Sequence, residues 1–260
     1  MSLLKKLART GFVAFLLLFI LGLSAILGIY IFLAPGLPSA SKIKEVHLQV
    51  PLRIYSLEGD LLAEYGEKRR KPLIIKDIPL LMKQAFLAAE DNRFFHHPGV
   101  DYQGLLRAAV HLAKTGQKGQ GGSTITMQLT RNFFLSRERT YTRKLREIFL
   151  ALKVERELTK EEILELYLNK IYLGNRAYGV GAAAGVYYGK QVSELDIAQI
   201  AMIAGLPKAP SKYNPIADPE RAKIRRNYVL SRMHTLGFIG EQSYEAAIST
   251  PVSAQPHSPV

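Results

Sequence analysis

Residues 119–147, GQGGSTITMQLTRNFFLSRERTYTRKLRE, run from a glycine-rich loop through six Arg and Lys side chains to Glu147. If residues 139–152 are helical, their apolar and charged side chains fall on opposite faces. The expected apolar face holds Leu145, Ile148, Phe149 and Leu152. The expected charged face holds Arg139, Arg143, Arg146 and Glu147. This stretch predicts a helical protein with a cationic face for a large anion; a solvated helix surface is the alternative.

A second acidic residue, Glu90, lies at the end of another predicted helix. That helix is expected to begin with Asp77 as its N-cap, and its apolar residues recur at helical spacing. Phe94 and Phe95 follow Glu90 closely. Partial desolvation by these two rings would raise the pKa of the Glu90 carboxyl toward that of a general base. A solvated helix C-terminus is the alternative reading of the same residues.

Residues 11–33 contain no charged side chain. At about 1.5 Å per residue, a helix of this length spans the ~30 Å hydrocarbon core of a bilayer. We therefore expect a transmembrane helix at 11–33 after a cytoplasmic tail at 1–10; a cleaved signal peptide is the alternative. Basic residues are more numerous before this segment than just after it, which favours an N-terminus inside the cell and the remainder outside.

The composition narrows the classes of partner and chemistry. The chain has no cysteine, so disulfides, thiolate metal sites and cysteine nucleophiles are excluded. Its net charge of +13 calls for an anionic partner, such as nucleic acid, a lipid surface or a phosphorylated substrate. Tethering on the outer face of a membrane argues against nucleic acid. Anionic lipid and a phosphorylated substrate therefore remain.

The rest of the chain suits a short linker at 34–50, one domain at 51–249 and a tail at 250–260, of which residues 253–260 are expected to be disordered. Alternating apolar and polar residues at 52–65 predict a β-hairpin. Thr159 and Glu162 form a capping box ahead of an apolar pattern. The remaining signals are helical, so the fold class is mostly α with a small β element.

Two further helices are expected to build the core. The first begins near Ser193 and Asp196, is apolar nearly all round and stops at Gly205, so it should be the central helix. The second begins at 218–219. Its inward-facing residues are expected to be Ile224, Tyr228 and Met233.

Five segments occur in an order that resembles one family. They are EDNRFFHHPG (90–99), GGSTITMQ (121–128), RKLRE (143–147), KEEILELYLN (160–169) and RRNYVL (225–230). They are similar to the five motifs of the family 51 peptidoglycan glycosyltransferases. These form a domain of class A penicillin-binding proteins and also occur as monofunctional transglycosylases. The resemblance covers residues 52–249 and implies a lysozyme-like α domain with a small β-hairpin, preceded by one transmembrane helix.

This resemblance implies an activity and its partners. The family polymerises lipid II: the 4-hydroxyl group of the acceptor sugar attacks C1 of the growing glycan chain and expels undecaprenyl pyrophosphate with inversion. Lipid II, the growing glycan chain and membrane lipids are the implied partners, with no nucleic acid. The implied place is the inner (plasma) membrane, with a periplasmic or extracellular catalytic domain. The natural protein is expected to continue into a transpeptidase domain, and this domain and other cell-wall synthesis proteins are further expected partners.

By motif position, the resemblance implies that Glu90 is the general base. Glu147 would be the second acid, positioning the donor or its pyrophosphate, directly or through a divalent cation such as Mg²⁺ or Mn²⁺. No cofactor is implied to be obligatory. His96 and His97 are expected to cap or pack, because no third metal ligand lies at a suitable spacing.

The resemblance also assigns substrate contacts. Guanidinium groups fit phosphate oxygens. The implied phosphate ligands are Arg131, Arg139 and Arg146, with Arg107 as another basic contact. The implied ligands of sugar and phosphate oxygens are Ser123, Thr124 and Gln128. Lys160, Tyr167 and Asn169 are interpreted as structural, whereas Asp91, Lys144, Arg225 and Arg226 could be structural or belong to the site.

The sequence departs from the family at Met127, where a glutamine is usual. Met cannot donate the amide hydrogen bonds of Gln, so one polar contact is in doubt. Gln128 remains, and activity is expected to survive.

Two other functions stay open. A lysozyme-like glycan-cleaving enzyme needs an acid for its sugar leaving group, whereas the cations before Glu147 suit a leaving group that is already anionic. A non-catalytic, membrane-anchored cell-wall scaffold would not need both Glu90 and Glu147.

Overall fold

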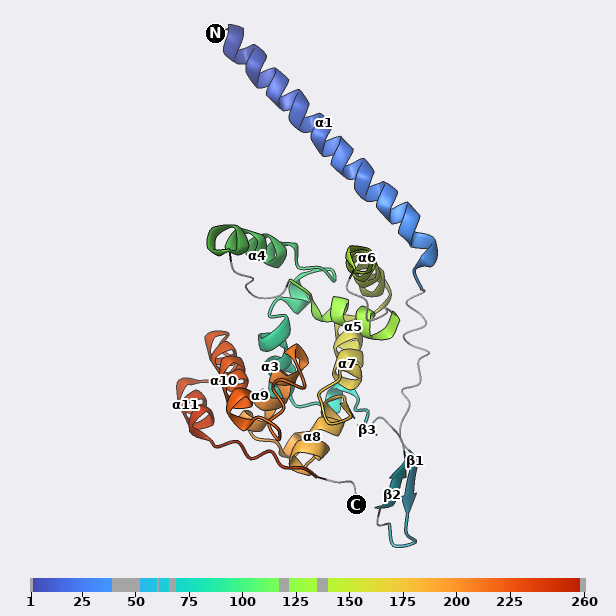
Figure 1. Cartoon of the computed structure of the whole chain (residues 1–260), viewed down its shortest axis with the longest axis vertical. Coiled ribbons are helices and arrows are strands. Elements are labelled where there is room, and N and C mark those ends of the chain that lie inside the picture. Colours follow the sequence, from blue (N-terminus) through green and yellow to red (C-terminus); the bar gives the residue numbers. More distant parts are fainter. Residues whose placement is uncertain are drawn as a thin grey trace.

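The computed structural model describes residues 2–38, 52–59, 61–65, 69–116, 122–134 and 140–257. The described chain is mostly helical, with one β-hairpin and one short two-stranded sheet, so the predicted mostly α fold class is confirmed. Figure 1 shows a long N-terminal helix, α1, above a body of packed helices, with the hairpin at the opposite end. The proposed domain boundaries remain predictions.

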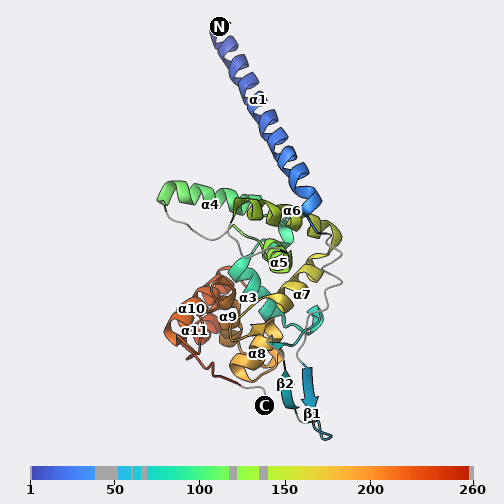
Figure 2. The same ribbon diagram turned by 45° about the vertical axis from the view of Figure 1, so that its right-hand side comes forward.

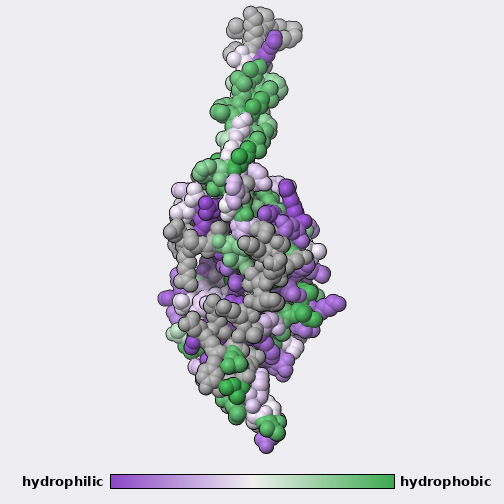
Figure 3. Space-filling view, turned by 90° about the vertical axis from the view of Figure 1, so that its right-hand side faces the viewer, coloured by the Kyte–Doolittle hydropathy of each residue, from purple (hydrophilic) through white to green (hydrophobic). Residues whose placement is uncertain are grey.

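Helix α1 (Ser2–Leu33) is followed by a 3₁₀ turn, η1 (Ala34–Gly36). Its segment Arg9–Leu33 has a mean hydropathy of 2.8 and is not buried against the body. Figure 3 shows this segment as an apolar shaft above a largely hydrophilic body. Among the described residues it is the one helix long and apolar enough to cross a membrane, as residues 11–33 predicted.

The predicted hairpin is present. Strands β1 (Leu52–Tyr55) and β2 (Leu61–Tyr65) pair antiparallel, with an irregularity at 54–55. A second sheet joins β3 (Arg69–Arg70) to β4 (Ala177–Tyr178) in parallel. This pairing fixes the start of the body against its middle.

The lower layer of the body is built around α9 (Ile197–Gly205), whose residues are nearly all buried. Asp196 caps it reciprocally with Gln199. It packs against α3 (Leu80–Glu90), α8 (Val180–Tyr188), α10 (Pro219–Thr235) and α11 (Glu241–Ser249). An apolar helix of this kind is stable only when neighbours cover every face, so α9 is the centre of the core, as predicted.

The upper layer lies on the side of α1 (Figures 1 and 2). It contains α4 (Tyr102–Thr115), α5 (Ile125–Phe134) and α6 (Tyr141–Glu157). Helix α7 (Lys160–Lys170), with the predicted Thr159–Glu162 capping box, packs against α5 and α8 and so joins the layers. Short 3₁₀ turns η2 (Ile75–Asp77), η3 (Phe94–His96), η4 (Val192–Glu194) and η5 (Leu206–Lys208) complete the body.

Two predicted helix starts are wrong. Asp77 ends the turn η2, and the extended backbone of Pro79 moves the start of α3 to Leu80. Ser193 lies inside η4, which has its own capping box, so Asp196 alone caps α9. In both cases a 3₁₀ turn takes up the polar residue that looked like a cap.

The predicted face of α6 is also wrong. Its buried residues are Glu147, Leu150, Ala151 and Val154, whereas Leu145, Ile148, Phe149 and Leu152 are only partly buried. The apolar pattern assumed that a carboxylate points to solvent. Here Glu147 turns inward because two cations of its own helix accompany it.

Helix α10 begins with Asp218 as its N-cap, as expected, and Met233 is buried. Ile224, however, is 71% exposed, and its two neighbours Arg225 and Arg226 are buried in its place. Their guanidinium groups donate to carbonyl oxygens of other elements, which offsets the cost of burial.

The predicted disordered tail is wrong for residues 253–257. The backbone N–H groups of Gln255 and His257 donate to the carbonyl oxygens of Tyr187 and Val186, at 3.0 and 3.2 Å. These carbonyls belong to the last turn of α8, where helices leave acceptors unpaired. Residues 258–260 lie outside the described residues.

Candidate active site

The larger cavity, of about 570 Å³, lies between the two layers. Its walls come from the end of α3, the inner side of α4, the start of α5, the turn η5 and the middle of α10. The polar and aromatic residues that line it are Glu90, Asp91, Asn92, Asp101, Arg107, His111, Ser123, Thr124, Gln128, Arg131, Lys208, Arg225, Tyr228 and Arg232. Most of its charged side chains are basic, so the cavity suits an anion.

Glu90 is the last residue of α3 and points into this cavity with a side chain that is 13% exposed. Its Oε2 accepts a hydrogen bond of 3.0 Å from Gln128 Nε2. Its Oε1 lies 3.4 Å from Arg225 Nη2. The carboxyl group is therefore oriented from two sides, by α5 and by α10.

Burial raises the pKa of the Glu90 carboxyl above its usual range. The Gln128 hydrogen bond and the nearby charge of Arg225 oppose part of the rise. The direction agrees with the prediction, but the predicted cause does not. Phe94 packs against the rings of Phe95 and His97, and neither phenylalanine lines the cavity.

The Gln128 side chain is oriented by a hydrogen bond from the core. Its Oε1 accepts a hydrogen bond of 3.2 Å from the Tyr167 hydroxyl group, which lies in the core. Burial, and then the nearby Glu90 charge, raise the pKa of Tyr167, so the phenol stays a donor. Because Tyr167 donates to its carbonyl oxygen, Gln128 must present its NH₂ group to Glu90.

Glu147 lies on the buried side of α6 and is 1% exposed. Lys144 Nζ lies 3.1 Å from Glu147 Oε2 and donates to Ser123 Oγ at 2.6 Å. Lys144 therefore joins the second acid to the wall of the cavity. Glu147 itself does not line the cavity.

The second cation beside Glu147 is Arg143, whose Nε lies 3.3 Å from Oε1. This contact meets the distance for an ion pair, yet it lacks hydrogen-bond geometry, and both atoms are buried. Attraction between opposite charges depends on direction far less than a hydrogen bond does, so the two groups still attract each other at this distance. Each carboxylate oxygen of Glu147 therefore faces one cation.

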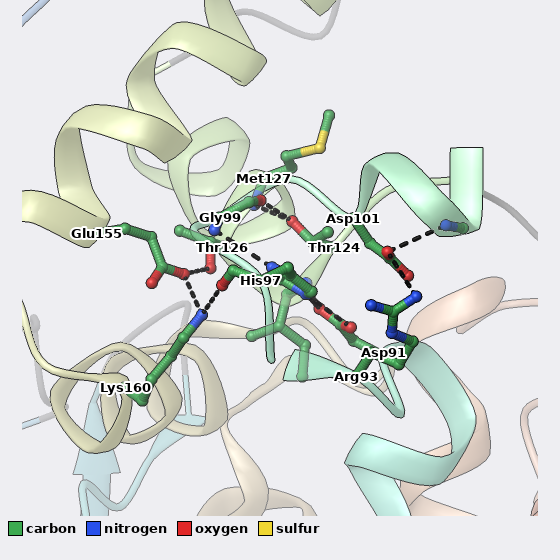
Figure 4. Close-up of polar contacts among 12 residues, drawn as sticks. Asp91, Arg93, His97, Gly99, Asp101, Thr124, Thr126, Met127, Glu155 and Lys160 are labelled. Atoms are coloured by element: carbon green, nitrogen blue, oxygen red, sulfur yellow. Dashed lines mark hydrogen bonds and ion pairs between the residues drawn. The ribbon is translucent and has the colours of Figure 1, made fainter. Parts of the chain in front are cut away.

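Asp91 fixes the start of α5 against the end of α3 (Figure 4). Its carboxylate bonds to His97 Nε2 at 3.0 Å and accepts from the Ile125 N–H at 3.0 Å. Thr124 Oγ1 donates to the Gly99 carbonyl oxygen at 2.5 Å. Gly99 has a φ of +93°, and an added Cβ would lie 2.8 Å from the Ala151 carbonyl oxygen, so only glycine fits there.

Lys160 and Asn169 also hold elements together. Lys160 Nζ bonds to the His97 carbonyl oxygen and to Glu155 Oε1, both at 2.7 Å, and Thr126 donates to the same carboxylate oxygen (Figure 4). The Asn169 amide bonds to both backbone groups of Leu73, at 2.9 and 2.7 Å. Neither residue lines the cavity. Their geometry agrees with a structural interpretation.

The predicted phosphate ligands are divided. Arg107 and Arg131 line the cavity, whereas Arg146 is exposed on α6 and does not. Arg139 lies outside the described residues. Arg107 is also 4.0 Å from Asp101, the N-cap of α4.

The two arginines of the last motif have different surroundings. Arg225 belongs to the cavity: its Nε donates to the Gly205 carbonyl oxygen at 3.1 Å, and its Nη2 faces Glu90. Arg226 instead donates to the carbonyl oxygens of Thr250 and Ile248, at 2.7 and 3.0 Å. Arg226 therefore holds the end of α11, away from the cavity.

Sequence reasoning missed six polar or aromatic residues of the cavity wall: Asn92, Asp101, His111, Lys208, Arg232, and Tyr228 as a wall residue. Lys208 ends η5, directly after the core helix α9, and Arg232 lies two helical turns after Arg225. Residues that follow a buried helix often line a site, and that signal could have found Lys208.

The residues do not fit a divalent cation at Glu147, because both carboxylate oxygens already face cations. In the part of the chain that the structure describes, no group of three His, Asp or Glu side chains could hold a metal. We therefore assign no step to a metal.

Comparisons with known proteins agree with the motifs. The transglycosylase family matches residues 58–234. Penicillin-binding protein 1A of Pseudomonas aeruginosa is 55% identical over 230 residues, covering 88% of this chain and 28% of that protein. Penicillin-binding protein 1A of Escherichia coli is 53% identical over 240 residues, covering 92% of this chain and 28% of that protein.

The crystal structure of penicillin-binding protein 1A from Haemophilus influenzae is also similar. It is 34% identical, with a TM-score of 0.48, over 82% of this chain and 22% of that one. The chain thus spans less than a third of the length of these relatives. The family match covers more than half of the chain, and its five motifs are in order. The chain belongs to the transglycosylase family, the family 51 glycosyltransferase domain of class A penicillin-binding proteins.

Proposed function

We propose that this chain is a peptidoglycan glycosyltransferase that polymerises lipid II into glycan strands, with inversion and release of undecaprenyl pyrophosphate. The observation that carries the proposal is Glu90, a largely buried carboxyl group of raised pKa, in a cavity where basic side chains outnumber acidic ones. A base and a cationic wall are the two things that this transfer requires.

In the proposed reaction, the 4-hydroxyl oxygen of the acceptor sugar forms a bond to C1 of the donor. The bond between C1 and the pyrophosphate oxygen breaks, and its electron pair leaves with the pyrophosphate. The hydroxyl proton passes to Glu90. Gln128 and Arg225 hold the two carboxylate oxygens, so the base keeps one orientation while the bonds change.

The leaving group gains negative charge, and the cavity supplies donors to meet it. Arg131 and Arg107 line the wall, and Ser123 is held by Lys144. Guanidinium groups offer paired N–H donors to phosphate oxygens. In this proposal Glu147 holds Lys144 and Arg143 in place, and so acts on the pyrophosphate through them.

We further propose that α1 anchors the chain as a single membrane span, with a cytoplasmic N-terminus and the body outside. Its length and hydropathy support a span. Lipid II is itself a membrane lipid, so anchoring would keep enzyme and substrate on one surface. We also propose that the natural protein continues into a transpeptidase domain, since the chain spans under a third of its relatives.

A glycan-cleaving enzyme is the second candidate, because a carboxyl group of raised pKa also suits a general acid. Its sugar leaving group carries no charge and would not need the cationic wall. The two functions therefore differ in substrate: the glycosyltransferase uses a lipid pyrophosphate, and the glycan-cleaving enzyme uses a finished glycan.

The test is to incubate the detergent-solubilised chain with labelled lipid II and to separate the products on a gel. A ladder of glycan strands supports the proposal, and its loss in Glu90→Gln but not in Lys212→Ala assigns it to the cavity. Lys212 is exposed and lies outside the cavity. Shortening of preformed glycan without a ladder would favour the hydrolase instead.

A further inference from the structure

A second cavity, of about 440 Å³, lies where α6 meets the end of α1. It shares no lining residue with the first cavity. Its walls are Tyr30, Leu37, Phe149, Leu152, Lys153, Arg156 and Glu157. None of these residues has a role in the proposed transfer reaction.

The position of this cavity points to a bilayer surface. Tyr30 lies in the last turn of the apolar segment Arg9–Leu33. Its ring meets the Phe149 ring edge to face, with centroids 5.2 Å apart. Both ribbon views place α6 at the foot of α1 (Figures 1 and 2). If α1 crosses a membrane, this cavity opens at the level of the lipid headgroups, where aromatic residues gather.

The chemistry of the walls matches a lipid. Apolar and aromatic side chains form one side: Tyr30 of α1, Leu37 just after η1, and Phe149 and Leu152 of α6. On the other, Lys153 and Arg156 stand one helical turn apart with Glu157, so the charged wall carries one net positive charge. Lys153 Nζ donates to the Pro38 carbonyl oxygen at 3.3 Å, which holds its ammonium group at the cavity. A phospholipid has the same division between acyl chain and phosphate.

We propose that this cavity binds one anionic phospholipid, its phosphate between Lys153 and Arg156 and its acyl chain against Phe149 and Tyr30. A single phosphodiester charge balances the single net positive charge of the wall. This binding accounts for the apolar side chains of α6 that the body leaves only partly buried. The inference rests on the membrane anchoring in the proposed function but not on the transfer reaction.

The experiment uses a fluorescent reporter inside the cavity. The chain contains no tryptophan, so Phe149→Trp introduces a single one. The full chain with this substitution is placed in phosphatidylcholine nanodiscs that contain a small fraction of either brominated phosphatidylglycerol or brominated phosphatidylcholine. Bromine quenches tryptophan on contact. We expect phosphatidylglycerol to reach half-maximal quenching at a lower lipid fraction than phosphatidylcholine, by roughly fivefold for each basic side chain.

Matched variants separate the site from the overall charge. In the reporter background, Lys153→Glu with Arg156→Glu should remove the preference for phosphatidylglycerol. Lys76→Glu with Lys212→Glu changes the net charge equally at two exposed positions outside both cavities, and should keep it. If the variant with both glutamates does not fold, the variant Lys153→Gln with Arg156→Gln is measured instead. It should also lose the preference for phosphatidylglycerol.

Two results would overturn the inference: equal quenching by both lipids in the reporter chain that keeps Lys153 and Arg156, or equal loss of preference in both pairs of variants. The second would mean that the charge of the whole chain attracts the lipid. Glycan synthesis is measured on the same samples. Selective quenching without glycan synthesis would contradict the transfer reaction and support the lipid site. Glycan synthesis without selective quenching would support the transfer reaction and contradict the lipid site.

Discussion

Glu147 is a buried carboxyl group and Glu90 a largely buried one, but they lie in different layers and have different hydrogen-bond and ion-pair partners. Glu90 ends a helix of the lower layer and meets a neutral amide and one guanidinium group from other elements. Glu147 lies within a helix of the upper layer and meets two cations of that same helix. Burial raises the pKa of the Glu90 carboxyl group, which suits a group that takes up a proton, whereas the Glu147 carboxylate holds the two cations of its own helix in place. Glu90 is therefore the base in the proposed reaction, and Glu147 is the acid that positions Lys144 and Arg143. We call Glu147 the anchor of these two cations.

The sharpest test of this division is Glu90→Gln. The amide cannot accept the hydroxyl proton, so we expect glycan synthesis to fall by about 10² to 10⁴-fold, as is typical for loss of a general base. Folding should survive, because an amide oxygen can still accept from Gln128. Synthesis is followed with labelled lipid II and folding by thermal unfolding. Near wild-type synthesis would remove Glu90 from the role of base.

The cationic wall is tested by a pair of arginines. Arg131→Ala removes a group that lines the cavity, and we expect it to weaken lipid II binding by about 1.5–3 kcal/mol, the usual worth of a charge-assisted contact. Arg146→Ala removes an exposed charge outside the cavity and should have a smaller effect. Binding isotherms of the two variants decide it. Equal losses would mean that diffuse charge, and not the cavity, attracts the substrate.

Replacing Glu147 should lower the stability of the fold. Glu147→Gln leaves Lys144 and Arg143 without a counter-charge in a buried place, so the free energy of unfolding should fall by about 1–3 kcal/mol. The range is below that of a fully buried pair because Lys144 is 37% exposed. Denaturant unfolding measures it, with Glu90→Gln as the control. If Glu90→Gln is the more destabilised of the two, the division between base and anchor is wrong.

A substitution at Met127 should affect stability more than synthesis. Its side chain is fully buried, so Met127→Gln places an amide among apolar neighbours. We expect a loss of stability of about 1–3 kcal/mol unless the amide finds a partner, and a change in synthesis of less than tenfold. Unfolding and initial rates report the two effects separately. A large gain in synthesis would instead show that Met127 limits the natural enzyme.

The smallest expected effect is a trend with pH. A carboxyl group with a raised folded pKa stabilises the fold fully below its unfolded pKa, and that stabilisation is lost as pH rises through the folded pKa. The pKa of Glu90 is raised, so stability should decline over that interval, and Glu90→Gln should lack this decline. Thermal unfolding from pH 4 to 8 compares the two proteins. The rate of synthesis should fall on the acid side of the same interval.

The sequence predicted features that depend on local signals. The hairpin, the Thr159–Glu162 capping box and the central apolar helix α9 each follow from a pattern a few residues long. The position of Glu90 at a helix end was predicted in the same way. Local rules suffice where neighbours in sequence supply the interactions.

Patterns failed where a charge is buried with a distant or unexpected partner. Glu147 and Arg226 both point inward because ion pairs or backbone carbonyls compensate their burial, and a pattern that assigns charges to the surface places them wrongly. The far wall of the cavity, with Lys208 and Arg232, is brought to Glu90 only when η5 and α10 pack against α3. No local pattern reports that meeting.

The contact between Arg69 and His257 has a consequence for folding. Arg69 Nη1 donates to the His257 carbonyl oxygen at 3.4 Å, across 188 residues of sequence. Together with the β3–β4 pairing and the backbone bonds from residues 255–257 to α8, it closes the chain into one large loop. Closing such a loop costs chain entropy before it yields contacts, so these contacts should form late in folding. Once formed, they couple both ends of the body, which should then exchange their amide hydrogens as one unit and not fray separately.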